Sequence, residues 1–266
     1  MTGSGTHGKG RRAGLWIAAV TVVVLALVVV FLVLPAVRRQ AFRTVGSVVT
    51  FGSYPQQAQG TDRTPIQWQV LDVQGDRALL LSCRGLDTRQ YHTEKTETTW
   101  AACSLRAWLN GEFLNRAFSG REQAGILATD VDNGPAQGYG EWKTEGGDNT
   151  RDRVFLLSCA EAEQYLGAQY YRGPGNTNSE KAQAAPTAFA LQNGAWRSSW
   201  QLTWRSDGLR TDDERRAGWW WLRSPGSDPG SAAYIFATGG FDSYEVNETS
   251  GMVRPAIWLD LKADIF

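Results

Sequence analysis

Apolar residues run without interruption near the start of the chain and alternate with polar residues through most of the remainder. The uninterrupted run, GLWIAAVTVVVLALVVVFLVLPA (Gly14–Ala36), has 23 residues and no charge. About 20 apolar residues cross the hydrocarbon core of a bilayer, whereas the apolar part of a cleavable signal peptide has about 7–15. The pattern therefore predicts one uncleaved transmembrane helix, with a polar tail over residues 1–13 before it and a juxtamembrane linker over residues 37–46 after it.

The charges that flank this run do not decide its orientation, because three basic residues precede it and three follow it. Large domains cross a membrane largely regardless of their charge. A short polar tail is a poor cargo for translocation compared with a whole domain. We therefore expect the tail in the cytoplasm, the anchor in the cell membrane and the folded body outside.

Beyond residue 46 the spacing of apolar positions predicts strands first and then helices. Ser47–Gln56 has the composition of a strand, and IQWQVLDV, QGD and RALLLSC read as strand, turn and strand of a hairpin. Ser104–Phe118 repeats its apolar residues at spacings close to three and four, which predicts an amphipathic helix with Ser104 as its N-cap. Arg153–Leu166 predicts a short strand followed by a helix that Ser158 caps.

The last third of the chain returns to strand-like alternation. AAYIFATGGFDSYEVN predicts two strands around a Gly-Gly turn, and GMVRPAIWLDL predicts one closing apolar strand. The chain shows neither a repeat period nor a second core. The sequence thus predicts a single α+β domain over residues 47–262, with short antiparallel strands, a few helices and long loops.

The distribution of charge narrows the choice of partners. Six of the 27 Lys and Arg residues fall within residues 1–43, which hold no acid, so 21 basic residues face all 27 acids in the rest of the chain, a net charge of −6. A mildly acidic body argues against nucleic acid as a partner.

Histidine and cysteine offer little for catalysis or metal binding. The two histidines are His7 in the tail and His92 in a polar loop, and no zinc-binding spacing is present. The three cysteines, Cys83, Cys103 and Cys159, are an odd number, so one disulfide or three buried thiols both remain open. We predict no metal and no cofactor.

Acidic loops provide two further candidates for chemistry. Oxygen ligands of the kind that calcium takes cluster in two of these loops, as Asp130, Asp132, Asn133, Asp148 and Asn149. Neither loop matches the 12-residue EF-hand pattern, so we interpret them as solvated loop acids. Asp212 and Asp213 could serve as a pair of glycosidase carboxylates, but nothing in the sequence fixes their separation.

Aromatic residues are the stronger signal, and many of the twelve tryptophans and their aromatic neighbours lie in the last third. On a strand Trp219 and Trp221 share one face and Trp220 takes the other. Tyr234 and Phe236 share a face in the same way. We predict that at least two of the three adjacent tryptophans are core and that Arg223 ties its strand to neighbouring backbone or acid.

Six stretches of the sequence resemble a bacterial family of unknown function, number six-two-seven-three in the domain-of-unknown-function series. They are FGSYPQ, PIQWQVLDVQGDRALLLS, TTWAACSLRAWLNGEFLNRAF, VFLLSCAEAEQYL, WWLRSPG and VRPAIWLDL. The resemblance implies a C-type-lectin-like fold, akin to formylglycine-generating enzymes and to the variable proteins of diversity-generating retroelements. The chain lacks the Glu-Pro-Asn and Trp-Asn-Asp motifs of calcium-dependent lectins, and its last cysteine, Cys159, lies too early for the active cysteine pair of formylglycine-generating enzymes.

Carried onto this chain, the resemblance implies that Trp220–Gly226 and Val253–Ala256 form a scaffold, which includes Trp220, Trp221, Arg223 and Arg254. The segment between them, Ser227–Ser250, would then present the ligand. Its aromatic and polar side chains suit recognition. The predicted ligand-binding residues are Tyr234, Phe236, Phe241, Asp242, Tyr244, Glu245 and Asn247.

These observations together predict a membrane-anchored extracytoplasmic recognition or adhesion module for an unknown protein or glycan ligand. They show no catalytic constellation. Two alternatives remain open: an envelope enzyme that acts on glycan or protein, and a structural partner of another membrane protein.

Overall fold

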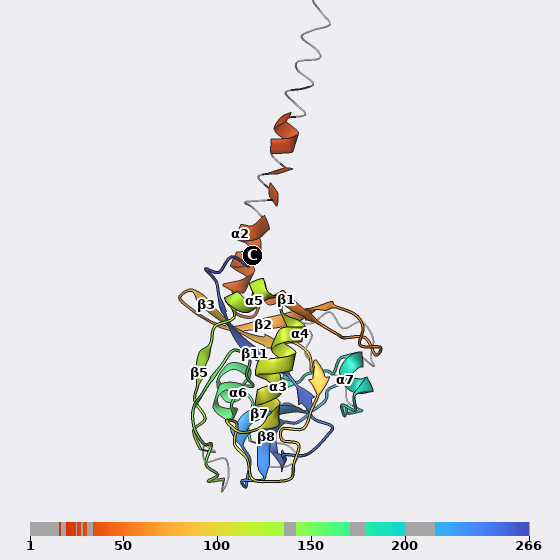
Figure 1. Cartoon of the computed structure of the whole chain (residues 1–266), viewed down its shortest axis with the longest axis vertical. Coiled ribbons are helices and arrows are strands. Elements are labelled where there is room, and N and C mark those ends of the chain that lie inside the picture. The colour runs from red at the N-terminus through yellow and green to blue at the C-terminus, as the bar shows by residue number, and fades with distance from the viewer. Residues whose placement is uncertain are drawn as a thin grey trace, which may run out of the picture.

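Two β-sheets form the centre of the folded body, and short helices cover them (Figure 1). The computed structural model describes Trp16 and residues 20–24, 26–27, 29–30, 34–135, 142–170, 179–199 and 216–265. Both sheets combine with helices in one core. The α+β class predicted from the sequence is therefore confirmed.

The first sheet is antiparallel and joins the two ends of the body. Its order is β1 (Val48–Tyr54), β2 (Thr64–Gln74), β3 (Arg77–Ser82) and β11 (Ala256–Asp260). Gln74 pairs with Arg77, which leaves a two-residue turn, and Gly75 in that turn has φ +60°. A positive φ at the first turn residue suits a hairpin, and glycine adopts it without strain. The predicted hairpin is confirmed.

The second sheet carries the tryptophan-rich strand at its centre. Its order is β4 (Asp87–Thr88), β10 (Met252–Val253), β7 (Trp220–Pro225), β8 (Ser231–Ile235) and β9 (Phe241–Glu245). The pairing is antiparallel except between β10 and β7, which run parallel. Strands β8 and β9 flank the predicted Gly-Gly turn, where Gly239 has φ +93°.

The closing segment is two strands in different sheets, so the single strand predicted for GMVRPAIWLDL is wrong. Strand β10 belongs to the second sheet and β11 to the first. Arg254 and Pro255 separate them, and proline has no N–H to continue a ladder. The buried Arg254 side chain donates to the carbonyl oxygen of Ser82 at 2.7 Å, which fixes this crossing between the sheets.

The predicted helix over residues 104–118 is present but contains a wider turn. Its parts are α3 (Ser104–Trp108), the π-helical turn η2 (Leu109–Phe113) and α4 (Leu114–Ala117). The N-cap is Cys103, whose sulfur accepts from the Arg106 N–H at 3.4 Å, so the prediction of Ser104 as N-cap is wrong. The Ser104 hydroxyl accepts from the Thr93 N–H instead, at 3.1 Å, and holds the preceding polar loop.

The remaining helices and strands are short. These elements are α5 (Gly120–Gly125), β5 (Thr129–Val131), β6 (Thr150–Asp152), α6 (Cys159–Leu166), the 3-10 turn η3 (Glu180–Ala182) and α7 (Ala188–Gln192). Ser158 caps α6 as predicted and forms a capping box with Glu161, in which each side chain bonds the other residue's backbone N–H.

The short strand predicted to begin at Arg153 lies earlier, as β6. Val154–Leu157 is buried but makes only a bridge between Phe155 and Ala256. The carbonyl oxygens of Leu156 and Leu157 accept instead from the side chain and the backbone N–H of Arg223, at 2.8 and 2.9 Å. Contact with a distant arginine therefore replaces a strand ladder here.

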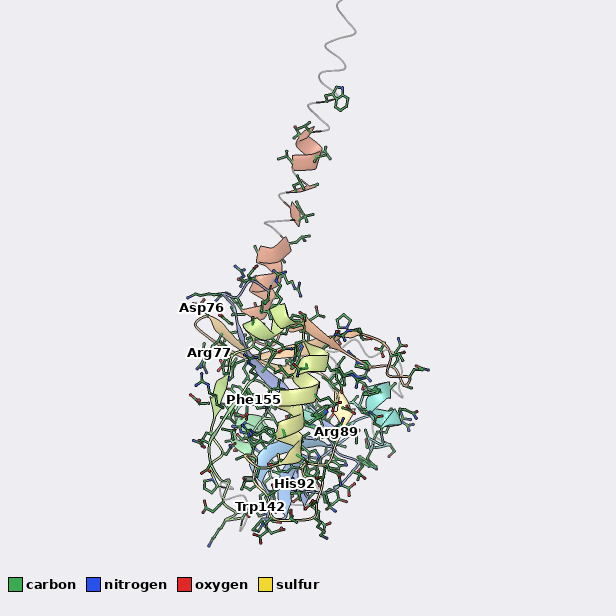
Figure 2. The ribbon with its side chains drawn as sticks, in the orientation of Figure 1. Asp76, Arg77, Arg89, His92, Trp142 and Phe155 are labelled. Carbon is green, nitrogen blue, oxygen red and sulfur yellow. The ribbon has the colours of Figure 1, made fainter. Side chains whose placement is uncertain are left out.

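Helix α2 (Leu34–Phe42) leads into the body beside the first sheet (Figure 1). Its last residue, Phe42, is buried in the core, and Arg43 donates to Asp76 at 2.8 Å in the β2–β3 turn (Figure 2). The first part of the predicted linker is thus helical and ends against the body. Ten of the 23 residues of the predicted anchor Gly14–Ala36 lie outside the described residues, and the described part of the chain contains no helix long and apolar enough to cross a membrane.

Candidate functional site

The three adjacent tryptophans divide between the two faces of the second sheet, as the alternation predicts. Trp219 and Trp221 share a face and meet edge to face, with ring centroids 4.8 Å apart. Trp220 points the other way, where its indole N–H donates to the carbonyl oxygen of Ala182 at 3.0 Å and Arg254 lies 4.9 Å from its ring centroid. All three are buried. The prediction that at least two of them are core is confirmed.

The register of β7, β8 and β9 decides which side chains join Trp219 and Trp221. Tyr234 pairs with Trp221 on one side and with Asp242 on the other. Directly paired residues of antiparallel strands point to the same face. Tyr244 pairs with the small Ala232, and its ring reaches Trp219 at 5.5 Å and Tyr234 at 5.7 Å.

These rings surround a concave space of about 270 Å³, which we call the aromatic hollow. Trp196, which follows α7, stacks on Phe236 with ring centroids 6.0 Å apart. Trp196 is 40% exposed and Tyr244 45%, so both rings are accessible at the rim. The residues that line the hollow are Trp196, Trp219, Tyr234, Phe236, Tyr244 and Ser250.

Two carboxylates lie beside the aromatic hollow. Asp242 is cross-strand to Tyr234, and burial raises the pKa of its carboxyl above the ordinary value. Glu248 accepts from the hydroxyl of Ser250 at 2.8 Å and from its N–H at 3.1 Å, so it borders the hollow on the Ser250 side. No Lys or Arg in the described part of the chain forms an ion pair with either carboxylate.

The structure brings three of the seven predicted ligand-binding residues into the hollow: Tyr234, Phe236 and Tyr244. Asp242 joins them on the same face. Glu245 is exposed and pairs with Lys95 at 2.7 Å. The backbone carbonyl of Asn247 accepts from the side chain of Gln90 at 2.7 Å.

Phe241, by contrast, lies in the core. It pairs with Ile235, and both side chains point to the inner face of the sheet. Its ring contacts Tyr170 at 6.0 Å between centroids and is fully buried. The two-residue period of a strand, which places Asp242 and Tyr244 outward, necessarily turns Phe241 inward.

Four residues of the site are absent from the predicted ligand-binding set: Trp196, Trp219, Glu248 and Ser250. Trp196 lies forty positions before Phe236, on which it stacks. Its backbone N–H donates to the carbonyl oxygen of Ser250 at 3.1 Å. No local pattern in the sequence encodes such a contact. The abundance of aromatic residues in the last third of the chain was the one available signal.

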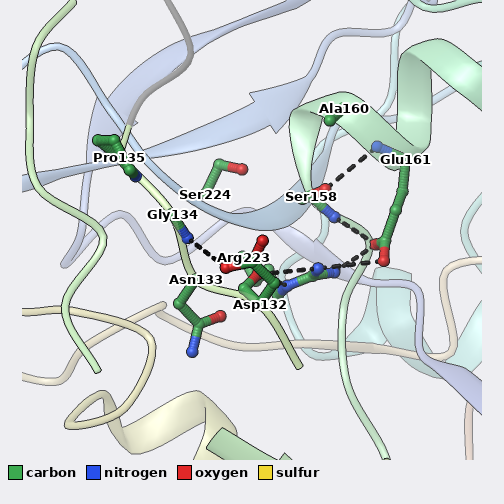
Figure 3. Close-up of a pocket in the computed structure, with 9 residues that line it drawn as sticks. All are labelled: Asp132, Asn133, Gly134, Pro135, Ser158, Ala160, Glu161, Arg223 and Ser224. Atoms are coloured by element: carbon green, nitrogen blue, oxygen red, sulfur yellow. Dashed lines mark hydrogen bonds and ion pairs between the residues drawn. The ribbon is translucent and has the colours of Figure 1, made fainter. Parts of the chain in front are cut away.

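Arg223 acts as predicted, by tying its strand to neighbouring backbone and acid. Its guanidinium donates to the carbonyl oxygens of Asp132 and Leu156, at 3.1 and 2.8 Å, and pairs with Glu161. Figure 3 shows the small pocket of about 160 Å³ beside it. There the Glu161 carboxylate turns to Arg223 and to the N–H of Ser158, so Glu161 and Arg223 already satisfy each other.

The other candidates for chemistry have structural contacts. His92 lies near the lower end of the body (Figure 2), and its Nδ1 accepts from the N–H of Ser104 at 3.2 Å. The three cysteines are buried and form no disulfide with one another, and burial raises the pKa of Cys103 and of Cys159 to about 12. A thiol with such a pKa is a poor nucleophile at neutral pH.

The acidic loops make local contacts as well. Asp130 pairs with the exposed Arg151 at 3.3 Å, and Asp132 accepts from the N–H of Gly134 at 3.1 Å. Within the described residues no three His, Cys, Asp or Glu side chains group as metal ligands. Asp212 and Asp213 lie outside the described residues.

Comparison with known proteins gives one match. The model of a family described as a domain of unknown function, DUF6273, matches residues 75–261, from the β2–β3 turn to just past the end of β11. No curated protein and no solved structure matches the chain. The matched region contains every residue that lines the aromatic hollow.

Proposed function

The chain belongs to the DUF6273 family, and from this premise we propose that it is a membrane-anchored recognition module whose ligand binds at the aromatic hollow. The observation that carries the proposal is the pair of accessible rings, Trp196 and Tyr244, at the rim of a concavity built on a packed sheet. Exposed rings of this size present a large apolar area to water, and a ligand that covers this area gains binding free energy.

Rigidity supports the proposal. Trp219 and Tyr234 form the floor of the hollow, and each of these two rings contacts at least two other aromatic rings. Tyr and Trp present large contact areas with few rotatable bonds, so holding them in place before binding reduces the entropy lost on binding.

The lectin-like relation inferred from the sequence motifs is part of this proposal. In it Trp220–Gly226 and Val253–Ala256 are scaffold, and Ser227–Ser250 is the presented segment. Support comes from the parallel pairing of β7 with β10, because the segment then leaves and rejoins neighbouring strands. Four of the six lining residues fall within or at the end of this segment, as Tyr234, Phe236, Tyr244 and Ser250.

The proposed anchor is Gly14–Ala36, with the tail in the cytoplasm and the body outside the cell membrane. Strands β7 and β8 lie in the half of the body opposite α2 (Figure 1). The aromatic hollow would consequently be held away from the membrane surface, where an extracellular partner could reach it.

Binding of the full chain, held in nanodiscs of phosphatidylglycerol, to glycan and protein arrays tests this function. We expect at least one ligand whose signal falls tenfold or more when Trp196→Ala and Tyr244→Ala are combined. Val45→Ser is the matched control, because Val45 is an exposed apolar residue beside α2. Ligands that bind wild type and the double variant equally would refute the hollow as the recognition site.

A further inference from the structure

The rings around the aromatic hollow bound it from several directions. Trp219 meets Tyr234 and Tyr244 at interplanar angles of 72° and 81°, with centroids 5.2 and 5.5 Å apart. A flat ligand would favour parallel rings, whereas steeply inclined rings enclose a rounded group. The electron-rich faces of tyrosine and tryptophan attract cations in addition to excluding water.

The size of the hollow limits what can enter it. Its volume of about 270 Å³ lies just below the roughly 300–1,000 Å³ typical of pockets for drug-sized ligands. A compact group on a small molecule, or the end of a longer chain, fits this space. An extended apolar ligand does not.

The carboxylates beside the hollow form no ion pair within the described residues. Among the described residues the Asp242 carboxylate accepts one hydrogen bond, from the N–H of Ser243 at 2.8 Å, and it is only half buried. Glu248 accepts three, all from Thr249 and Ser250. By contrast Glu245, on the same strand as Asp242, is neutralised by Lys95. Two carboxylates without an ion-pair partner in the described residues thus flank a set of aromatic rings.

We propose that the aromatic hollow binds a methylated ammonium group, which its rings enclose and the carboxylates of Asp242 and Glu248 attract. This inference rests on the proposed function and names the ligand class of the same site. Methyl groups make a quaternary ammonium rounded and weakly hydrated, so it gains both apolar contact and cation–π attraction. A primary ammonium keeps its strong hydration and fits the hollow less well.

Calorimetric titration of the full chain with choline and with 3,3-dimethylbutan-1-ol isolates the contribution of charge, because the alcohol has the same shape and no charge. The chain is held in phosphatidylglycerol nanodiscs, which contain no choline. We expect choline to bind at least tenfold more tightly than the alcohol. Equal binding of the two, or no binding of choline, would overturn the inference.

Matched variants assign the effect to the hollow. Tyr244→Phe keeps a ring and should bind choline within about threefold of wild type, whereas Tyr244→Leu should weaken binding at least fivefold. Asp242→Asn should weaken binding, and Glu245→Gln, which changes the carboxylate paired with Lys95, should not. Equal loss in Asp242→Asn and Glu245→Gln would point to general surface charge and contradict the assignment.

Two further arms identify the source of the group. Choline binding accompanied by capture on phosphatidylcholine vesicles supports a lipid headgroup, and choline binding without capture supports a soluble or polymer-borne group. If choline fails to bind while an array ligand still depends on Trp196 and Tyr244, this inference falls and the proposed function stands.

Discussion

Arg223 joins its strand to the segments that hold Asp132, Leu156 and Glu161. It is 4% exposed and satisfies two backbone carbonyls and one carboxylate from segments sixty to ninety positions earlier. A planar guanidinium reaches all of them at once, which a lysine ammonium cannot do. The motif around Arg223 predicts that it ties its strand to neighbouring groups, but not which groups these are.

Arg223→Lys is expected to lower the free energy of unfolding by about 2–4 kcal/mol, because the buried carbonyls and Glu161 would lose donors. Urea denaturation followed by tryptophan fluorescence measures this change. Arg151→Lys is the control and should cost less than about 0.5 kcal/mol, since Arg151 is exposed. Similar losses for both variants would contradict the role assigned to Arg223.

The ionised carboxylate of Asp242 is expected to lower the stability of the fold, although it contributes to the proposed binding of the ligand. Its folded-state pKa is raised by burial, so the folded protein binds the proton more tightly than the unfolded chain. The contribution of Asp242 to the free energy of unfolding is therefore greatest below the ordinary pKa of aspartate, and it declines as the pH rises through the raised pKa of the folded state.

Asp242→Asn is accordingly expected to raise the free energy of unfolding at pH 7 slightly, by no more than about 0.5 kcal/mol at this half-buried position. The same substitution should leave stability unchanged or lower below pH 4, where the wild-type carboxyl is protonated. Thermal unfolding at the two pH values measures the difference. A lower midpoint at pH 7 would mean that the charge stabilises the fold.

At the scale of elements, the close packing of β10 against β7 requires a glycine. A Cβ on Gly251 would overlap the rings of both Trp219 and Trp221. In contrast a Cβ on Gly111, in the π-helical turn η2, would meet nothing within 4 Å. The two glycines therefore differ in what a methyl group would do.

Gly251→Ala is expected to destabilise the protein by about 1–3 kcal/mol through overpacking and to disturb the floor of the aromatic hollow. Gly111→Ala should stabilise by about 0.5–1 kcal/mol, because alanine restricts the unfolded chain and suits a helix. Urea denaturation of both variants gives the comparison. Equal effects of the same sign would show that the packing around Gly251 has been misjudged.

Local patterns predicted the elements whose stability is local. The β2–β3 hairpin follows from alternation and a Gly-Asp turn, and α6 from its N-cap Ser158 and the acids that follow it. The failures occurred where distant contacts decide: the break at Arg254–Pro255 moves the chain between sheets, and Arg223 takes the carbonyls that a strand at Val154–Leu157 would have used.

For the whole molecule, the site could be predicted only where it follows strand period. Tyr234, Phe236 and Tyr244 came from alternation and do line the hollow, whereas Phe241 was assigned to the wrong face. Trp196 and Glu248 join the site through contacts with Ser250, which only the folded chain creates.

The proposed orientation can be tested with the native cysteines as a silent background. All three are buried, so a membrane-impermeant maleimide should label wild type slowly. Thr249→Cys adds an exposed thiol near the hollow and should be labelled on intact cells. Labelling that appears only after lysis would place the body in the cytoplasm and reject the proposed topology.

An NMR titration with choline that follows the indole N–H resonances tests directly whether the ligand binds in the aromatic hollow, because these resonances report where a ligand binds. Each tryptophan is assigned by a Trp→Phe variant of the full chain. We expect the resonances of Trp196 and Trp219 to shift. Those of Trp68 and Trp100 should stay unchanged, because the buried indole N–H groups of these two residues donate to Phe51 and Asp152, away from the hollow. Unchanged resonances at Trp196 and Trp219 under saturating choline would contradict this binding site.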